Sequence, residues 1–185
     1  MADSRTTDEL LADIVTDFAA VIDFALKVSM SATGEPTTKA GEWGSIVFAK
    51  MCVNAISAKT LVTQEIFDHI AIVTVCRIMM ESMTLYFYLH EDVASTEWQC
   101  RELAIALHDT TGRIKLMRGW QAKEEYADLI AGQDSLKAEM KANSFFQTLF
   151  SEQQTRLLSG EHFYIGGMNA AAVRAGWDQR NHCAV

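Results

Sequence analysis

Two residues of this chain have side chains that can act together on a phosphodiester. Arg101 and His108 stand seven positions apart in a segment that we expect to be helical, so both lie on nearly the same face. An arginine in such a pair can stabilise a phosphate while the histidine transfers a proton. The alternative interpretation is a chance pair on a solvated helix face, because short motifs often recur by accident.

A second set of charges lies within and beyond the most apolar stretch of the chain. Arg77 and Glu81 are the full charges of residues 70–89, and their four-residue spacing places them on one helix face. With Asp109 and Arg113 they form a predicted polar centre. One interpretation is a structural set of ion pairs, because a buried charge needs a partner. The other interpretation is the polar lining of a ligand pocket between helices.

The spacings typical of metal and nucleophile sites are missing from the sequence. The four cysteines are far apart and belong to no CxxC or Cys/His cluster, which predicts free thiols and no zinc site. Glu65 and His69 are four positions apart rather than three, and no second copy completes a di-iron set. No Gly-x-Ser-x-Gly turn or glycine-rich phosphate loop occurs. We therefore predict neither a metal site nor a cofactor.

The element expected to position these residues is the stretch 66–90, which is apolar on every face when drawn as a helix. Such a helix is either the centre of a bundle or a membrane span. Arg77 and Glu81 at its middle would each cost roughly 2.5–3.5 kcal/mol in a membrane. We therefore predict a buried central helix, with Thr63 as its N-cap.

The rest of the chain is patterned as helices around this one. Apolar residues recur at helical spacing over about 6–31, 43–61, 95–118, 121–142, 143–158 and 168–175, and no stretch alternates with period two for long. The sequence predicts an all-α fold, a bundle of about six or seven helices. It also predicts one domain over 1–185, in which residues 1–5 are disordered and 159–185 form a loop plus a short helix.

The net charge, the first residues and the cysteines indicate which partners and which cellular location to expect. The net charge of −8 disfavours nucleic acid, whose binding sites need a basic surface. The first residues lack the pattern of a signal peptide, and free cysteines are typical of a reducing compartment. We expect a cytoplasmic protein with no membrane attachment.

The runs CRIMMESMTLYFYL, WQCRELAIALHD and GRIKL resemble a bacterial all-helical family, domain of unknown function five-six-seven-seven. The positions that match its motifs are Arg77, Glu81, Arg101, Asp109 and Arg113. The resemblance implies a helical fold over about residues 45–180 and implies no activity. Because relatives continue into at least one further helix, it also implies that this chain lacks the family's C-terminal helices. An apolar face would then be exposed, so we expect a homodimer.

Arg101 and His108 also resemble the Arg-x4–6-His motif of helical ribonucleases of the HEPN type, which act as dimers on RNA. Glu102 follows the arginine where those enzymes usually have Asn, Asp or His, and the acidic net charge suits RNA poorly. We therefore predict a non-enzymatic module that binds a protein partner or a small apolar ligand, with Arg77 and Glu81 as its polar centre. The alternative is a metal-independent ribonuclease of toxin or phage-defence type.

Overall fold

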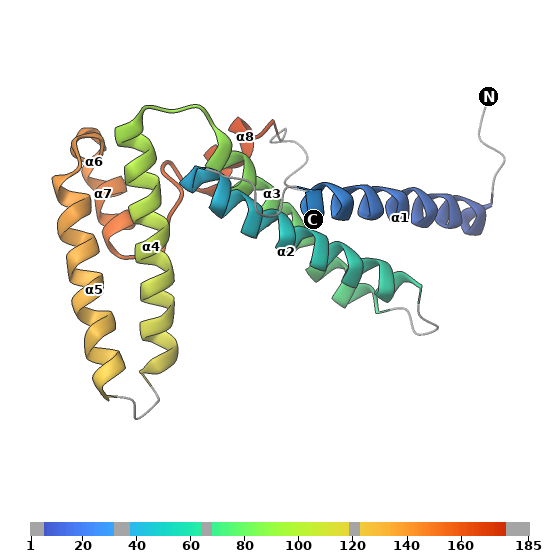
Figure 1. Ribbon diagram of the computed structural model, residues 1–185, viewed down its shortest axis with the longest axis horizontal. Helices are drawn as coiled ribbons and strands as arrows, with labels where there is room; N and C mark the ends of the chain where they lie inside the picture. Colours follow the sequence, from blue (N-terminus) through green and yellow to red (C-terminus); the bar gives the residue numbers. More distant parts are fainter. Residues whose placement is uncertain (1–5, 32–37, 64–67, 119–122, 177–185) are drawn as a thin grey trace. The chain divides into compact units, whose positions relative to one another are not determined.

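The computed structural model describes residues 6–31, 38–63, 68–118 and 123–176, and the chain is all-helical across these ranges. Its described helices, shown in Figure 1, are α1 (Thr7–Ser31), α2 (Lys39–Val62), α3 (His69–His90), α4 (Ser95–Met117), α5 (Lys123–Ala142), α6 (Ser144–Thr148), α7 (Ser151–Leu158) and α8 (Met168–Arg174). The predicted all-α bundle is confirmed. The predicted disorder of residues 1–5 lies outside the described residues.

The described residues form eight helices rather than six or seven because the predicted helix over 143–158 is two helices. Leu149 and Phe150 between them are extended. Two side chains bind the backbone that this break exposes: Gln154 Nε2 donates to the Leu149 carbonyl at 3.0 Å, and Gln153 Oε1 accepts from the Phe150 N–H at 3.2 Å. These side-chain hydrogen bonds satisfy backbone groups that a continuous helix would pair internally.

The chain divides into two compact units, Met1–Glu91 and Asp92–Val185, called unit 1 and unit 2 below. Unit 1 contains α1 to α3, and unit 2 contains α4 to α8. The prediction of a single domain over 1–185 stays a prediction.

Side-chain hydrogen bonds cap the N-terminal ends of α1 and α3 in unit 1. Thr6 and Glu9 form a capping box, in which Glu9 Oε2 accepts from the Thr6 N–H at 2.8 Å and Thr6 Oγ1 accepts from the Glu9 N–H at 3.3 Å. Asp68 caps α3, since its Oδ1 accepts from the Ala71 N–H at 3.0 Å. Thr63 lies instead at the C-cap of α2. The prediction of Thr63 as N-cap is therefore wrong, and aspartate is at least as good a cap as threonine.

In unit 1, α2 packs closely against α3, and α1 packs on α2. Gly44 of α2 lies close to α3, because a Cβ there would lie 2.1 Å from Cε1 of His90 on α3. The other residues that α2 buries are small or of moderate size: Val47, Cys52, Ala55 and Ala58. α1 buries Ile22.

The prediction that α3 is a buried central helix is wrong within this structure. The residues that α3 buries are Thr84, Tyr88 and Leu89, all toward its C-terminal end. Ile70 and Val73 near its start are 68% and 53% exposed. α2 is the helix that packs extensively on α3. A helix that is apolar on every face therefore leaves most of its faces uncovered.

The buried helix of the described chain is α4, in unit 2. Its buried residues are Cys100, Arg101, Leu103, Ala104, Ile105, Leu107, Thr111 and Ile114. Four of them join Met140 of α5, Phe146 of α6, Leu157 of α7 and Ile165 in one hydrophobic cluster. Unit 2 therefore has a core of its own.

One buried polar residue, Asn143, links the connection between α5 and α6 to α4. Asn143 is 7% exposed; its Oδ1 accepts from the Phe146 N–H at 2.9 Å, and its Nδ2 donates to the Thr96 carbonyl at 3.0 Å. Gly160, with φ of +69°, turns the chain after α7.

The C-terminal part of the described chain agrees with the sequence pattern. α8 and Gly176, which has a φ of +85°, confirm the predicted short helix and its terminating glycine.

Candidate functional site

Arg101 lies inside unit 2, and its side chain is 1% exposed. Its Nε donates to Glu97 Oε1 at 3.0 Å, one helical turn earlier on α4. The neighbouring Cys100 is fully buried, which raises the pKa of its thiol to about 11, with a further contribution from the Glu97 charge and an opposing one from Arg101. Arg101 is thus a buried, paired cation of the core.

His108, by contrast, is exposed. Its Nδ1 lies 2.9 Å from the Gly160 carbonyl oxygen, and its ring centroid lies 4.9 Å from that of Phe163. The structure therefore pairs Arg101 with Glu97 and His108 with the segment after α7. A phosphate would have to displace Glu97 to reach Arg101, so this geometry does not favour the ribonuclease interpretation.

The predicted polar centre consists of two exposed ion pairs, each within its own helix. Arg77 Nε and Glu81 Oε1 are 3.0 Å apart on α3, with side chains 74% and 43% exposed. Arg113 Nε and Asp109 Oδ2 are 2.8 Å apart on α4, with side chains 64% and 53% exposed. Ion pairs this exposed contribute roughly 0–1 kcal/mol each to stability. Neither pair has the burial that the structural or the pocket interpretation required.

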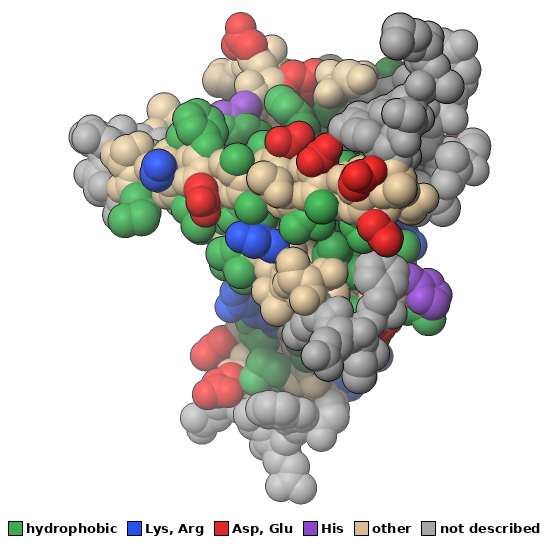
Figure 2. All heavy atoms as spheres, turned by 90° about the vertical axis from the view of Figure 1, so that its right-hand side faces the viewer, with side chains coloured by type: hydrophobic (Ala, Val, Ile, Leu, Met, Phe, Trp, Pro, Cys, Tyr) green, Lys and Arg blue, Asp and Glu red, His purple; other side chains and the backbone are tan. Residues whose placement is uncertain are grey.

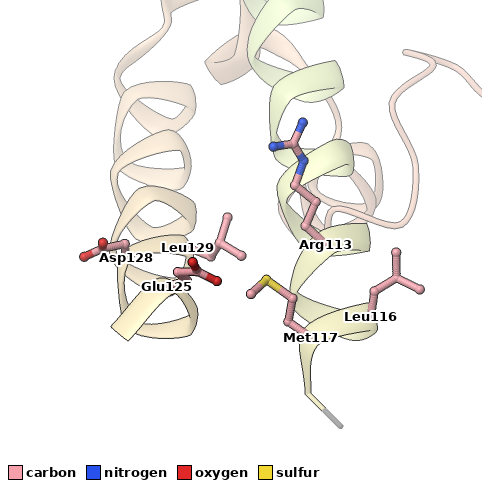
Figure 3. Close-up of a pocket in the computed structure, with 6 residues that line it drawn as sticks. All are labelled: Arg113, Leu116, Met117, Glu125, Asp128 and Leu129. Atoms are coloured by element: carbon pink, nitrogen blue, oxygen red, sulfur yellow. The ribbon is translucent and has the colours of Figure 1, made fainter. Parts of the chain in front are cut away.

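A groove of about 650 Å³ opens between α4 and α5 in unit 2. Figure 3 shows Met117 of α4 and Leu129 of α5 extending toward each other across it. The rest of the lining is Arg113, Leu116, Glu125 and Asp128. Arg113 is the lining residue that the sequence interpretation named, and the others carried no motif. The groove could take a small apolar ligand, with charged side chains at its edge.

The sequence interpretation expected an exposed apolar face but did not place it on unit 1, because it expected α3 to be buried. Large hydrophobic side chains are exposed on all three helices, and Figure 2 shows green side chains at the surface of one face of the molecule. They are Leu11, Ile14, Val21, Phe24, Val28 and Met30 on α1, Ile46, Val53 and Ile56 on α2, and Ile70, Val73, Ile78, Met83 and Phe87 on α3.

This surface could have been anticipated from spacing alone. Each of the three helices has apolar residues on more than one side, and a helix in a three-helix unit cannot bury them all. Exposed large hydrophobic side chains in such number are typical of a site of protein or membrane interaction. We call the exposed large hydrophobic residues of α1 to α3 the unit 1 apolar surface.

α2 and α3 also have the length and hydropathy of membrane spans, while 22% and 6% of their most apolar windows are buried. A core helix of a water-soluble protein passes the same test of length and composition, but such a helix is mostly buried, and α2 and α3 are not. Among the described residues, no three His, Cys, Asp or Glu side chains come together as a metal site.

Comparison of the chain with protein-family models, with curated proteins and with solved structures finds no match. The resemblance to domain of unknown function five-six-seven-seven therefore stays a prediction, and the site must be interpreted from its own geometry.

Proposed function

We propose that this protein is a non-enzymatic interaction module of the cytoplasm, which binds another protein through the unit 1 apolar surface. The observation that carries the proposal is the exposure of large hydrophobic side chains along α1, α2 and α3 together. Leaving a Val, Leu, Ile, Phe or Met side chain in water forgoes roughly 1.5–3 kcal/mol compared with burying it. A partner that covers several of them gains a large driving force.

A protein partner fits this surface better than a small ligand does. Small-molecule sites are concave and enclose most of the ligand, whereas these side chains are distributed over three helices. The groove between α4 and α5 supports a second candidate, the binding of a small apolar ligand, because its volume is about 650 Å³. If that candidate holds, filling the groove by Leu129→Trp removes one bound molecule of an apolar fluorescent dye, while the dye that binds the unit 1 hydrophobic residues remains.

Charged residues in the middle of α2 and α3 support an aqueous location. Lys50 lies midway along α2, and Arg77 and Glu81 lie midway along α3. Each would cost roughly 2.5–3.5 kcal/mol at the centre of a bilayer. The net charge of −8 in turn disfavours nucleic acid as the partner.

Site-specific photo-crosslinking in intact cells tests the proposal. A photoreactive amino acid at Val53 or Ile70 of the full chain is expected to give protein adducts in the cytosolic fraction, since both side chains are exposed and apolar. The matched control is Asp134, an exposed polar position on α5. Lipid adducts alone, or no more protein adduct at Val53 and Ile70 than at Asp134, would overturn the proposed function.

A further inference from the structure

One face of α3 has the spacing of a helix that pairs with another helix. Apolar residues recur there at alternating intervals of three and four, which is the pattern of a coiled-coil seam. We call these residues the α3 seam: Val73, Cys76, Met80, Met83 and Phe87. Met80 is half-buried and the others are exposed.

A pair of opposite charges lies beside the α3 seam at its middle. Arg77 donates through Nε to Glu81, and both side chains remain well exposed. A guanidinium carries five N–H donors, so Arg77 can bind Glu81 of its own helix and a second carboxylate as well. A partner that fits this place carries both an anion and a cation at matching positions.

A second copy of α3, running antiparallel, supplies that arrangement. If a two-fold axis passes near Met80, Val73 faces Phe87 of the partner subunit and Cys76 faces Met83 of the partner subunit. Small residues then meet large ones, which fills space better than like against like. A parallel copy would set Phe87 against Phe87 of the partner subunit.

The same axis makes the charges complementary. Arg77 comes within side-chain reach of Glu81 of the partner subunit, and the symmetry repeats the contact on the other side. We propose that two copies of this chain associate through the α3 seam as an antiparallel pair, with reciprocal Arg77–Glu81 contacts beside it. This proposal rests on the proposed function and names the partner as a second copy.

Cysteine cross-linking of the full chain tests the geometry, because a disulfide needs Cβ atoms about 3.5–4.5 Å apart. Cys76→Ser and Cys183→Ser remove one exposed thiol and one outside the described residues, while Cys52 and Cys100 stay because they are buried. In this background Met80→Cys is expected to form a disulfide-linked dimer under mild oxidation.

The matched control is Thr74→Cys in the same background, an exposed position of α3 outside the α3 seam. Cross-linking at Met80→Cys that does not exceed cross-linking at Thr74→Cys would overturn the proposal. So would a wild-type chain that cross-links through Cys76 to Cys76 of the partner subunit, because only a parallel pair brings those residues together.

Charge exchange tests the reciprocal contacts. Arg77→Glu and Glu81→Arg each set like charges together, and we expect each to weaken dimer association about tenfold or more in sedimentation experiments. The double exchange Arg77→Glu/Glu81→Arg restores opposite charges and is expected to restore association. Circular dichroism checks that all three variants keep their helix content. Equal association of all three with the wild type would overturn the proposal.

The two proposals fail in different ways. If photo-crosslinking at Ile70 traps an unlike protein while Met80→Cys cross-links no more than Thr74→Cys, the interaction module stands and the homodimer falls. If it traps only lipid, both fall.

Discussion

Arg101 and Arg113 lie on the same helix with an acidic partner one turn earlier, and they differ in burial. Arg101→Ala leaves the partly buried Glu97 without its cation, so we expect the free energy of unfolding to fall by roughly 3 kcal/mol. Arg113→Ala breaks an exposed pair and is expected to cost less than about 1 kcal/mol. Urea unfolding followed by circular dichroism measures both. Equal losses would mean that the Arg101 pair does not support the core.

Two glycines of unit 2 are expected to respond with opposite signs to the same substitution. Gly160 has a positive φ, and a Cβ there would lie 2.1 Å from Thr111 Oγ1 and 3.1 Å from the Leu107 carbonyl oxygen. Gly160→Ala should therefore lower the melting temperature, at a cost of roughly 2 kcal/mol.

Gly112 provides the control, because it lies within α4 and a Cβ there meets nothing within 4 Å. Gly112→Ala should stabilise the protein by roughly 0.5–1 kcal/mol, since alanine loses less backbone entropy in a helix. Thermal melts of the two variants that shift in the same direction would contradict the described turn.

The cysteines should differ in reactivity. Cys100 is fully buried and its thiol pKa is raised to about 11, so almost no thiolate forms in weakly alkaline buffer. Cys76 is exposed. Iodoacetamide should label Cys76 and leave Cys100 unlabelled until the protein unfolds, as read by peptide mass spectrometry. If two copies associate through the α3 seam, the dimer covers Cys76, and its labelling slows as the protein concentration rises. Equal labelling of Cys76 and Cys100 would contradict the burial.

At the scale of the elements, Asn143 links the start of α6 to the start of α4 through its Oδ1 and Nδ2 atoms. Asn143→Ala removes the cap and the link together, and should cost about 2 kcal/mol of unfolding free energy. Asn143→Ser keeps a capping oxygen and should cost less. A serine variant as unstable as the alanine variant would show that the cap contributes little. Chemical denaturation of both variants gives the comparison.

Helix positions could be predicted from the sequence because local signals determine them. The Thr6–Glu9 capping box, the segment beginning at Ser95 and the glycine after α8 all lie where the pattern predicted. Burial could not be predicted in the same way. α3 is the more apolar helix and α4 the more buried one, because hydropathy says what a face prefers and not which neighbours reach it.

The same holds for the candidate residues: their pairing within a helix could be predicted from the sequence, and their burial could not. The close pairing of Arg77 with Glu81 and of Asp109 with Arg113 follows from four-residue spacing. The burial of Arg101 depends on the packing of unit 2 around α4, which spacing does not encode. A signal for its partner was present, since Glu97 precedes Arg101 by four residues in the favoured order.

At the scale of the whole molecule, the two units should differ in independence. Unit 2 contains the described hydrophobic cluster around α4. A fragment of residues 92–185 should therefore fold alone and melt cooperatively by circular dichroism. A fragment of residues 1–91 should self-associate, as light scattering would show. A gradual, non-cooperative melt of the 92–185 fragment would contradict the assignment of a separate core to unit 2.

The exposed hydrophobic residues of α1 to α3 have a consequence for the degradation and abundance of this protein in a cell. If the proposed function holds, a newly made copy that has met no partner presents to chaperones and proteases the kind of surface by which they recognise damaged proteins. Surplus copies would then be degraded, and the steady-state abundance of this chain would follow the supply of whatever covers it.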